Sequence, residues 1–445
     1  MSAKNNSPLL HKHSEKTAFI YLALFALSFV LSIVGMLFTD GRSFADTLYQ
    51  DGMGMGDNFM DFYNSVCDAG TKQVYKVGVI YPPLANMFFY FLSKLLGPNL
   101  VSLPLNNRIT LLSDTTGLFL FLGFLFFSIA LFLRFIQQKL AGHCSCVISW
   151  LFSLALALSY PMIFCIQRGN LLLLTMVLSM FFVFFRNDNR KWVRELSLIA
   201  LAIAAGFKLY PAVFGFLLIK DKEYKRAARL VVYGLLTTVA PFFFYDGIES
   251  ILDLIANLNH FSGGLEFTPN YTTTDVFAYY FANFFPSDFE HYFNILHWAF
   301  FLPTTAAAVT VFFLTEDEWK RVFCLAYLFM NLNSSGQTYI LIFLIIPLVL
   351  FVVDKKHSKI DSVYFTCFAL LLIAIPVVYY KLIPLDRIEL RGFGQYLLTP
   401  NRLVSAPVLQ GMLLIVSLET IIRKITAEKS KRSKKSENNP DCNVE

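Results

Sequence analysis

The stretch TAFIYLALFALSFVLSIVGMLF, residues 17–38, decides the fold class, because it is an apolar run long enough to cross a membrane as a helix. A helix that spans the hydrocarbon core of a bilayer needs about 20 apolar residues. Lys4, Lys12 and Lys16 precede the run, and no clear small-residue cleavage site follows it. A secretory signal peptide has a shorter apolar core and such a cleavage site. We therefore expect an uncleaved membrane-spanning helix.

The rest of the chain has the same character. Its 445 residues are 56% hydrophobic and only 15% charged, whereas about a quarter of the residues in a soluble protein are charged. This composition predicts an all-α polytopic membrane protein, with about 10 full transmembrane helices and a pair of short re-entrant helices. The further helices that the apolar runs predict are 109–135, 144–164, 171–185, 229–245, 291–314, 361–380 and 402–422.

The basic residues predict the topology, because cytoplasmic loops of membrane proteins are enriched in Lys and Arg. Most of the 37 basic residues fall into clusters that can share one side of the membrane, among them 186–194, 220–229, 318–321, 354–359 and 423–435. If that side is the cytoplasm, both termini are cytoplasmic and 423–445 is a basic cytoplasmic tail. The segments 39–108 and 246–290 are then two outer loops. We expect a single domain over 1–422, embedded in the plasma membrane.

Two apolar segments, 195–219 and 322–353, are too short to cross the bilayer twice at a rise of about 1.5 Å per residue. Each contains a polar turn, GFKLYP (206–211) in the first and NLNSSGQ (331–337) in the second. Non-helical backbone at membrane depth is tolerated only where protein or a water-filled cavity surrounds it. Each segment should therefore form two short helices, with the turns beside an outward-facing polar cavity.

Two aspartates stand in GMGDNFMDFYNS, residues 54–65, early in the first outer segment. A solvated loop is the ordinary interpretation of acidic residues in such a place. Asp61, however, is followed by Phe62 and Tyr63, and an apolar setting suits a carboxylate to general-base chemistry. Asp61 is therefore the candidate base, with Asp57 as the alternative.

Further along the outer segment, YPPLANMFFYFLSKLLG (81–97) predicts a helix on the membrane surface. Its prolines suit a first helical turn, and the apolar stretch is short for a crossing. Arg168, in QRGN (167–170), and Lys208, in GFKLYP, are basic residues on the side where such residues are scarce. Two cations at one cavity suit a phosphate group, although side chains that reach to the membrane surface are the alternative. These motifs supply four further candidate cavity contacts: Tyr81, Asn170, Tyr210 and Gln337.

Other chemistries lack their usual sequence signals. The chain has no nucleotide-binding glycine loop and no His-rich set of metal ligands. We expect no cofactor, no metal site and no nucleic-acid partner.

In order and spacing, these motifs resemble glycosyltransferase family 87. This is a mannosyltransferase-like group of polytopic enzymes with the C-type integral-membrane glycosyltransferase fold. The likeness rests on MDFYNS (60–65), the surface-helix motif 81–97 and AAGFKLYPAVFGFLLI (204–219). QRGN stands where the family often has Gly-Gln-x-Asn.

The resemblance implies an inverting transfer of a sugar, mannose or a similar hexose, from a polyprenyl-phosphate donor. The acceptor would be a hydroxyl of a lipid or glycan on the outer face of the membrane, so the active site would face outward. An outer-loop aspartate acts as general base in such enzymes, and by position this role falls to Asp61. The expected partners are the lipid-linked sugar, the acceptor and membrane lipids. A polytopic transporter or lipid flippase is the alternative, although transporters commonly contain internal repeats and the two halves of this chain do not match.

Overall fold

The computed structural model describes residues 8–39, 41, 58–264, 288–332, 338–354, 358, 360–376 and 400–437. Within these ranges the chain forms helices and no strand, so the all-α prediction is confirmed. The α-helices are α1 (Pro8–Phe38), α3 (Met60–Asp68), α4 (Pro83–Ser93), α5 (Pro98–Val101), α6 (Thr115–Leu140), α7 (Cys146–Ala157), α8 (Tyr160–Arg168), α9 (Leu172–Phe185), α10 (Lys191–Phe207), α11 (Phe216–Lys220), α12 (Tyr224–Thr238), α13 (Ile248–Gly264), α15 (Phe289–Leu314), α16 (Glu318–Leu332), α17 (Ile345–Val352), α18 (Asp361–Leu372) and α19 (Pro400–Glu437). The 3-10 helices are η3 (Val74–Val77), η4 (Leu105–Leu112), η5 (Tyr210–Gly215), η6 (Ala240–Phe244) and η8 (Thr338–Leu344).

Among the described residues, five helical segments are long and apolar enough to cross a membrane, or six if the bent pair α7 and α8 forms one span. The predicted count of about ten crossings therefore stays a prediction. Further apolar helices, such as α9 and α18, are shorter. The five long segments are His13–Phe38, Thr115–Leu140, Tyr224–Phe244, His291–Leu314 and Val404–Ser430.

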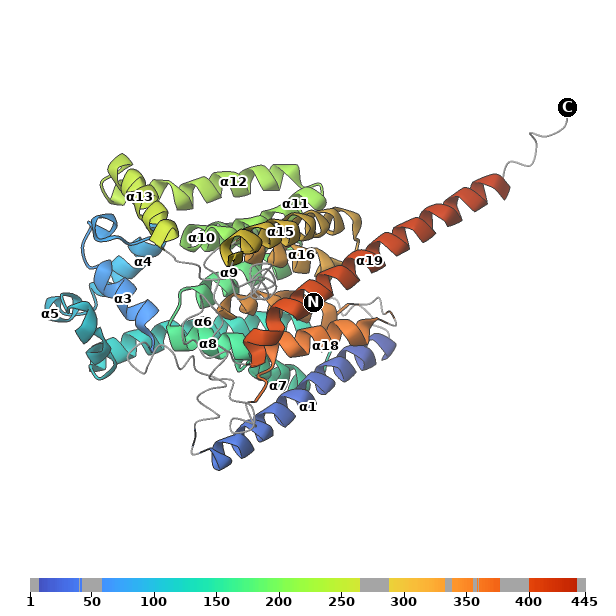
Figure 1. Ribbon diagram of the computed structural model, residues 1–445, viewed down its shortest axis with the longest axis horizontal. Helices are drawn as coiled ribbons and strands as arrows, with labels where there is room; N and C mark the ends of the chain where they lie inside the picture. Colours follow the sequence, from blue (N-terminus) through green and yellow to red (C-terminus); the bar gives the residue numbers. More distant parts are fainter. Residues whose placement is uncertain are drawn as a thin grey trace.

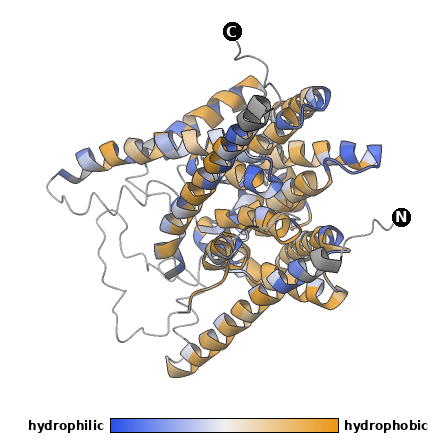
Figure 2. Ribbon diagram, turned by 90° about the vertical axis from the view of Figure 1, so that its right-hand side faces the viewer, coloured by the Kyte–Doolittle hydropathy of each residue, from blue (hydrophilic) through white to orange (hydrophobic). Residues whose placement is uncertain are grey.

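The long helices are largely hydrophobic along their length (Figure 2), and many of their large apolar side chains are exposed. On α6, for example, the phenylalanines Phe119, Phe126 and Phe127 are all more than half exposed. Extended apolar surface of this kind is rare on soluble monomers and marks contact with lipid or with another protein. Together with the length of the helices, it indicates insertion into a membrane.

The sequence predicted one continuous helix over 144–164, and this prediction is wrong. The chain instead forms α7 and α8, which meet at an angle of 52°. Ser159 has an extended conformation before α8, and Pro161 lies in its first turn. Because proline has no N–H group to donate to the preceding turn, it interrupts a continuous helix but is tolerated in the first turn of a new one.

The predicted break at GFKLYP is confirmed. Helix α10 ends at Phe207, Lys208 has an extended backbone, and η5 starts at Tyr210. Gly206 allows a close approach here, since a Cβ atom on it would lie 2.6 Å from a methyl group of Leu84 and 2.9 Å from the carbonyl oxygen of Thr237. The same turn thus packs against α4 and α12.

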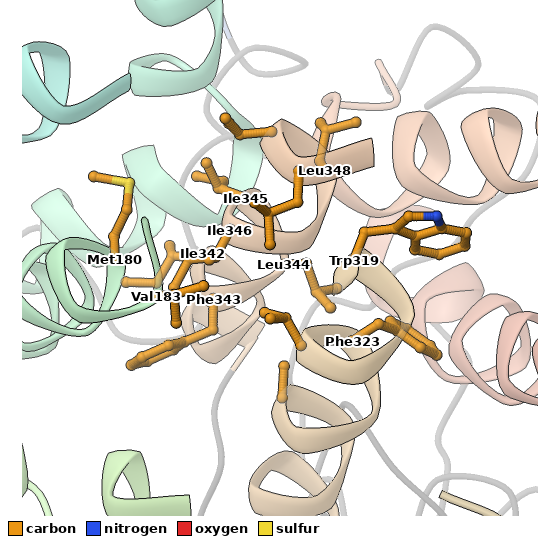
Figure 3. Packing of buried hydrophobic residues seen from close by; sticks show 14 of the residues in the cluster. Met180, Val183, Trp319, Phe323, Ile342, Phe343, Leu344, Ile345, Ile346 and Leu348 are labelled. Carbon is orange, nitrogen blue, oxygen red and sulfur yellow. The ribbon is translucent and has the colours of Figure 1, made fainter. Parts of the chain in front are cut away.

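The second broken segment forms the centre of the main core. Helix α16 leads into residues 333–337, which lie outside the described ranges, and the chain continues as η8 and α17. The side chains of Ile342, Phe343, Ile345 and Ile346 are fully buried in the same hydrophobic cluster as Phe323 of α16 (Figure 3). A short pair of helices surrounded by protein is consistent with the predicted re-entrant shape.

One end of the molecule gathers basic clusters that the topology prediction assigned to the cytoplasm. Arg186, after α9, pairs with Asp221 at 3.2 Å and with Glu318 of α16 at 2.9 Å. Arg423 of α19 pairs with Asp317 at 3.2 Å. Four of the clusters, around residues 186, 221, 318 and 423, therefore share one end of the fold, as the prediction requires.

The segment 39–108, predicted to be the first outer loop, forms a packed unit in its described part from residue 58 on, and we call this part the outer unit after that prediction. Helices α3, α4 and α5 lie together at one end, and the C-terminal part of α19 projects at the other (Figure 1). Phe62, Tyr63 and Phe89 are fully buried in a second hydrophobic cluster within this unit. Helix α4 has 11 residues and is about 16 Å long, which is too short to cross a bilayer.

The segment 246–290, predicted to be the second outer loop, begins with the 17-residue helix α13. Asn257 on this helix donates hydrogen bonds to the carbonyl oxygens of Tyr75, at 2.7 Å, and Val79, at 3.1 Å. The two outer segments are therefore joined, and 265–287 lie outside the described residues.

Candidate active site

Asp61 lies in the first turn of α3, where the backbone is held in a fixed conformation. Phe59, two residues before Asp61, has a left-handed conformation with φ of 61°. Its N–H group donates a hydrogen bond of 2.6 Å to the carbonyl oxygen of Gln167, and the Gln167 side chain donates one of 3.0 Å to Asn58. The start of α3 is therefore attached to the QRGN turn, although the two are more than 100 residues apart in sequence.

Gly169 makes this close attachment possible. It ends α8 in a left-handed conformation with φ of +65°, which a glycine adopts without steric cost. A Cβ atom at this position would lie 2.9 Å from the Cβ atom of Phe62 and 3.1 Å from the Cα atom of Phe59. The turn thus packs its backbone directly against α3 and brings the side chains on either side of Gly169 to Asp61.

Both carboxylate oxygens of Asp61 accept hydrogen bonds from this turn. Arg168 Nη2 lies 2.6 Å from Oδ1, and Asn170 Nδ2 lies 2.7 Å from Oδ2. The Asn170 side chain is itself fixed, because its Oδ1 accepts a hydrogen bond of 2.9 Å from the N–H group of Leu172. The sequence suggested an apolar setting for Asp61, but its carboxylate lies in an ion pair.

Lys208 supplies a second cation beside this carboxylate. Its position at the end of α10 brings its Nζ to 4.2 Å from the ring centroid of Tyr81, a cation–π distance. The ammonium is also within electrostatic range of Asp61 and Cys165. One carboxylate and two cations, Arg168 and Lys208, therefore lie in the same part of the structure.

Tyr81 is held in place by its backbone. Its carbonyl oxygen accepts hydrogen bonds from the Tyr75 hydroxyl, at 3.2 Å, and from Asn86, at 3.1 Å. Burial raises the pKa of the Tyr81 phenol above its ordinary value, and the negative charge of Asp61 acts in the same direction. The phenol therefore stays neutral and keeps its proton as a hydrogen-bond donor at physiological pH.

Two more tyrosines complete the cluster. The ring of Tyr210 stacks on Phe329, with 5.3 Å between the ring centroids. Tyr339, at the start of η8, is within electrostatic range of Asp61, Arg168 and Tyr210. The sequence did not identify Tyr339 as a site residue. It lies only two residues after Gln337, the last residue of the turn that was expected to border the cavity.

Six of the predicted site residues are therefore close together in space. The other two, Asp57 and Gln337, lie outside the described residues. The six residues that gather are Asp61, Tyr81, Arg168, Asn170, Lys208 and Tyr210. Within the described ranges, no three His, Cys, Asp or Glu side chains are placed to hold a metal ion.

Comparison with known proteins identifies the family of the chain. The profile of glycosyltransferase family 87 matches residues 80–335, a range that includes Tyr81, Arg168 and Lys208 and begins after Asp61. No curated protein and no solved structure matches the chain. Because the matched range covers more than half of the 445 residues, the chain belongs to glycosyltransferase family 87.

Proposed function

We propose that this glycosyltransferase moves mannose or a similar hexose, with inversion, from a polyprenyl-phosphate donor to a hydroxyl of a lipid or glycan acceptor. The observation that carries the proposal is the cluster of one carboxylate, Asp61, with two cations, Arg168 and Lys208. Sugar transfer from a phosphate donor uses both kinds of group. It needs a base for the acceptor hydroxyl and positive charge for the departing phosphate.

In the proposed step, Asp61 accepts the proton of the acceptor hydroxyl while the hydroxyl oxygen attacks the anomeric carbon of the sugar. The bond between that carbon and the phosphate oxygen breaks, and polyprenyl phosphate leaves with the bonding electrons. Lys208 and Arg168 stabilise its negative charge, while Asn170 orients the carboxylate. A single displacement inverts the anomeric centre, so a β-linked donor gives an α-linked product.

We further propose that the site faces the outside of the plasma membrane and that both termini are cytoplasmic. The concentration of basic clusters at the opposite end of the fold supports this orientation. A site on the outer face has no access to nucleotide sugars in the cytoplasm, whereas a sugar on a membrane lipid can reach it. The short helix α4, which follows Tyr81, would guide the lipid chain of the donor.

Purified protein in lipid, supplied with a labelled polyprenyl-phosphate hexose and candidate acceptors, tests the proposal. Asp61→Asn should abolish turnover while the protein remains folded. Asp68→Asn is the matched control, because Asp68 forms a similar pair with Arg108 at 2.7 Å in the same outer unit. Asp57→Asn tests the alternative base, and Gln337→Ala tests the last predicted contact.

The product distinguishes the possible outcomes. Full activity of Asp61→Asn, with loss in Asp57→Asn, would move the role of base to Asp57. A lipid that crosses the membrane chemically unchanged, without sugar transfer, would instead indicate a flippase. The anomeric configuration of the product checks inversion directly.

A further inference from the structure

The ion pair between Arg168 and Asp61 raises a chemical question for the proposed function, on which this inference rests. Arg168 Nη2 lies 2.6 Å from Oδ1 of Asp61, and only 15% and 18% of the two side chains are exposed. Asn170 occupies the other oxygen at 2.7 Å. Both oxygens of the candidate base are already hydrogen-bond acceptors, so an acceptor hydroxyl has to compete for them.

The same guanidinium is also suited to phosphate. Its planar fork of N–H donors matches the oxygens of a carboxylate and of a phosphate equally well. Lys208 lies in the same cluster, so a phosphate that enters between the two cations gains attraction from both. Asp61 and the donor phosphate are therefore rivals for Arg168.

We infer that Arg168 moves from Asp61 to the donor phosphate when the donor binds, and that this exchange makes the carboxylate available to the acceptor hydroxyl. The donor then binds first, and the base becomes accessible only when a sugar is present to be transferred. Arg168 thus couples donor binding to activation of Asp61.

The local structure allows the arginine to move while the carboxylate stays in position. Arg168 is the last residue of α8, and its long side chain can change rotamer without a change of the helix. Asn170 is only 3% exposed and is fixed by the N–H group of Leu172. It therefore continues to hold Oδ2 of Asp61 after Arg168 has moved.

The exchange predicts an unusual binding result. Asp61→Asn removes the carboxylate that competes with phosphate for Arg168, so this variant should bind polyprenyl phosphate more tightly than the wild type. Coupling free energies between two sites usually correspond to a change in affinity of about 5- to 150-fold, and we expect a gain in this range. The binding of polyprenyl phosphate to purified protein in detergent micelles measures it, with size-exclusion profiles as the check on folding.

Two controls make the measurement specific. Asp68→Asn removes an equal charge from a comparable pair in the same outer unit, with 2.7 Å between Asp68 Oδ1 and Arg108 Nη2, and should leave the affinity unchanged. Arg168→Gln should weaken binding by itself. In the double variant with Asp61→Asn, the gain from Asp61→Asn should disappear, because the residue that transmits it is absent.

A measurement on the wild type keeps the inference testable if a variant fails to fold. Polyprenyl phosphate should raise the affinity for the acceptor, since it takes Arg168 away from Asp61. In steady-state kinetics, the donor should bind before the acceptor.

The two proposals fail in different ways. Turnover that survives Asp61→Asn would overturn the role of Asp61 as base. An inactive Asp61→Asn variant that binds polyprenyl phosphate no more tightly than the wild type would overturn the exchange and leave the role of the base intact. Wild-type acceptor affinity that does not respond to polyprenyl phosphate would overturn the exchange as well.

Discussion

Lys208 Nζ lies 4.2 Å from the centroid of the Tyr81 ring, and this contact joins the break after α10 to the start of α4. This contact brings together two of the sequence motifs on which the resemblance to the family rests. The ammonium is also within electrostatic range of Asp61.

Replacement of Lys208 by Met should therefore impair use of the donor. Met keeps most of the length of the side chain but removes its charge, so the departing phosphate loses one cation. We expect kcat/KM for the donor to fall about 100-fold, a typical effect for the loss of one group that stabilises developing negative charge.

Lys94→Met is the matched control for this prediction. Lys94 Nζ also lies 4.2 Å from an aromatic centroid, that of Tyr90, in the same outer unit. This variant should retain wild-type kinetics. Equal kinetics in Lys208→Met and Lys94→Met would remove the phosphate role from Lys208.

Gly169→Ala should reduce both stability and activity. The left-handed backbone and the 2.9 Å contact with Phe62 leave no room for a methyl group. Gly247→Ala shares the positive φ, at 61°, but has open space around its Cβ position. We expect Gly169→Ala to lose about 1–3 kcal/mol more than Gly247→Ala, the usual cost of overpacking.

Thermal unfolding of the two variants in detergent checks this difference. Turnover should also fall in Gly169→Ala, because the turn carries both Arg168 and Asn170. Equal unfolding temperatures for the two variants would mean that α3 adjusts to the extra methyl group, and that the attachment is looser than its distances indicate.

A feature of the fold could be predicted from the sequence when its physical cause lay in neighbouring residues and no continuous apolar run concealed it. The break at GFKLYP follows from a glycine and a proline within six residues, so the sequence revealed it. The bend between α7 and α8 has Pro161 as a similar local cause, but the apolar run continues through it and concealed the bend. Helix α13 was not predicted, because 246–290 was assigned as an outer loop from the distribution of basic residues, which does not reveal helices within a loop.

The candidate site was predicted as individual residues rather than as an arrangement. Asp61 and Arg168 were identified separately, as a base and as a phosphate ligand, because their motifs are local. Their ion pair spans 107 positions of sequence and depends on the way α8 meets α3. Tyr339 was missed for the same reason, because its relation to Asp61 exists only after α16 and η8 have folded back into the core.

Cys67 should react slowly with a maleimide while the protein is folded, because it lies inside the outer unit. Burial raises the pKa of its thiol to about 11; Asp68 acts in the same direction and Arg108 opposes it. The thiolate is the reactive form, and a higher pKa makes it scarcer at pH 8. As long as the pH stays below the pKa of Cys67, the labelling rate should therefore rise about tenfold for each unit of pH.

Peptide mass spectrometry can compare Cys67 with the exposed Cys146 in one sample. Cys146 serves as the internal control and should be labelled first, while denaturant should remove the difference. Rapid labelling of Cys67 in the folded protein would mean that the outer segment is an open loop and not a packed unit.

The orientation in the membrane can be tested with two engineered cysteines in a variant that lacks the seven natural ones. Asn107, in η4, is exposed beside Arg108, in the unit that carries Asp61. Asn189 is exposed between α9 and α10, close to Arg186 and the ion pairs of the opposite end. If basic clusters mark the cytoplasmic side, a membrane-impermeant maleimide should label Asn107→Cys in intact cells and Asn189→Cys only after permeabilisation. The reverse pattern would place the site on the cytoplasmic side, where nucleotide sugars can reach it. It would then contradict the argument that only a lipid-linked sugar has access to the site.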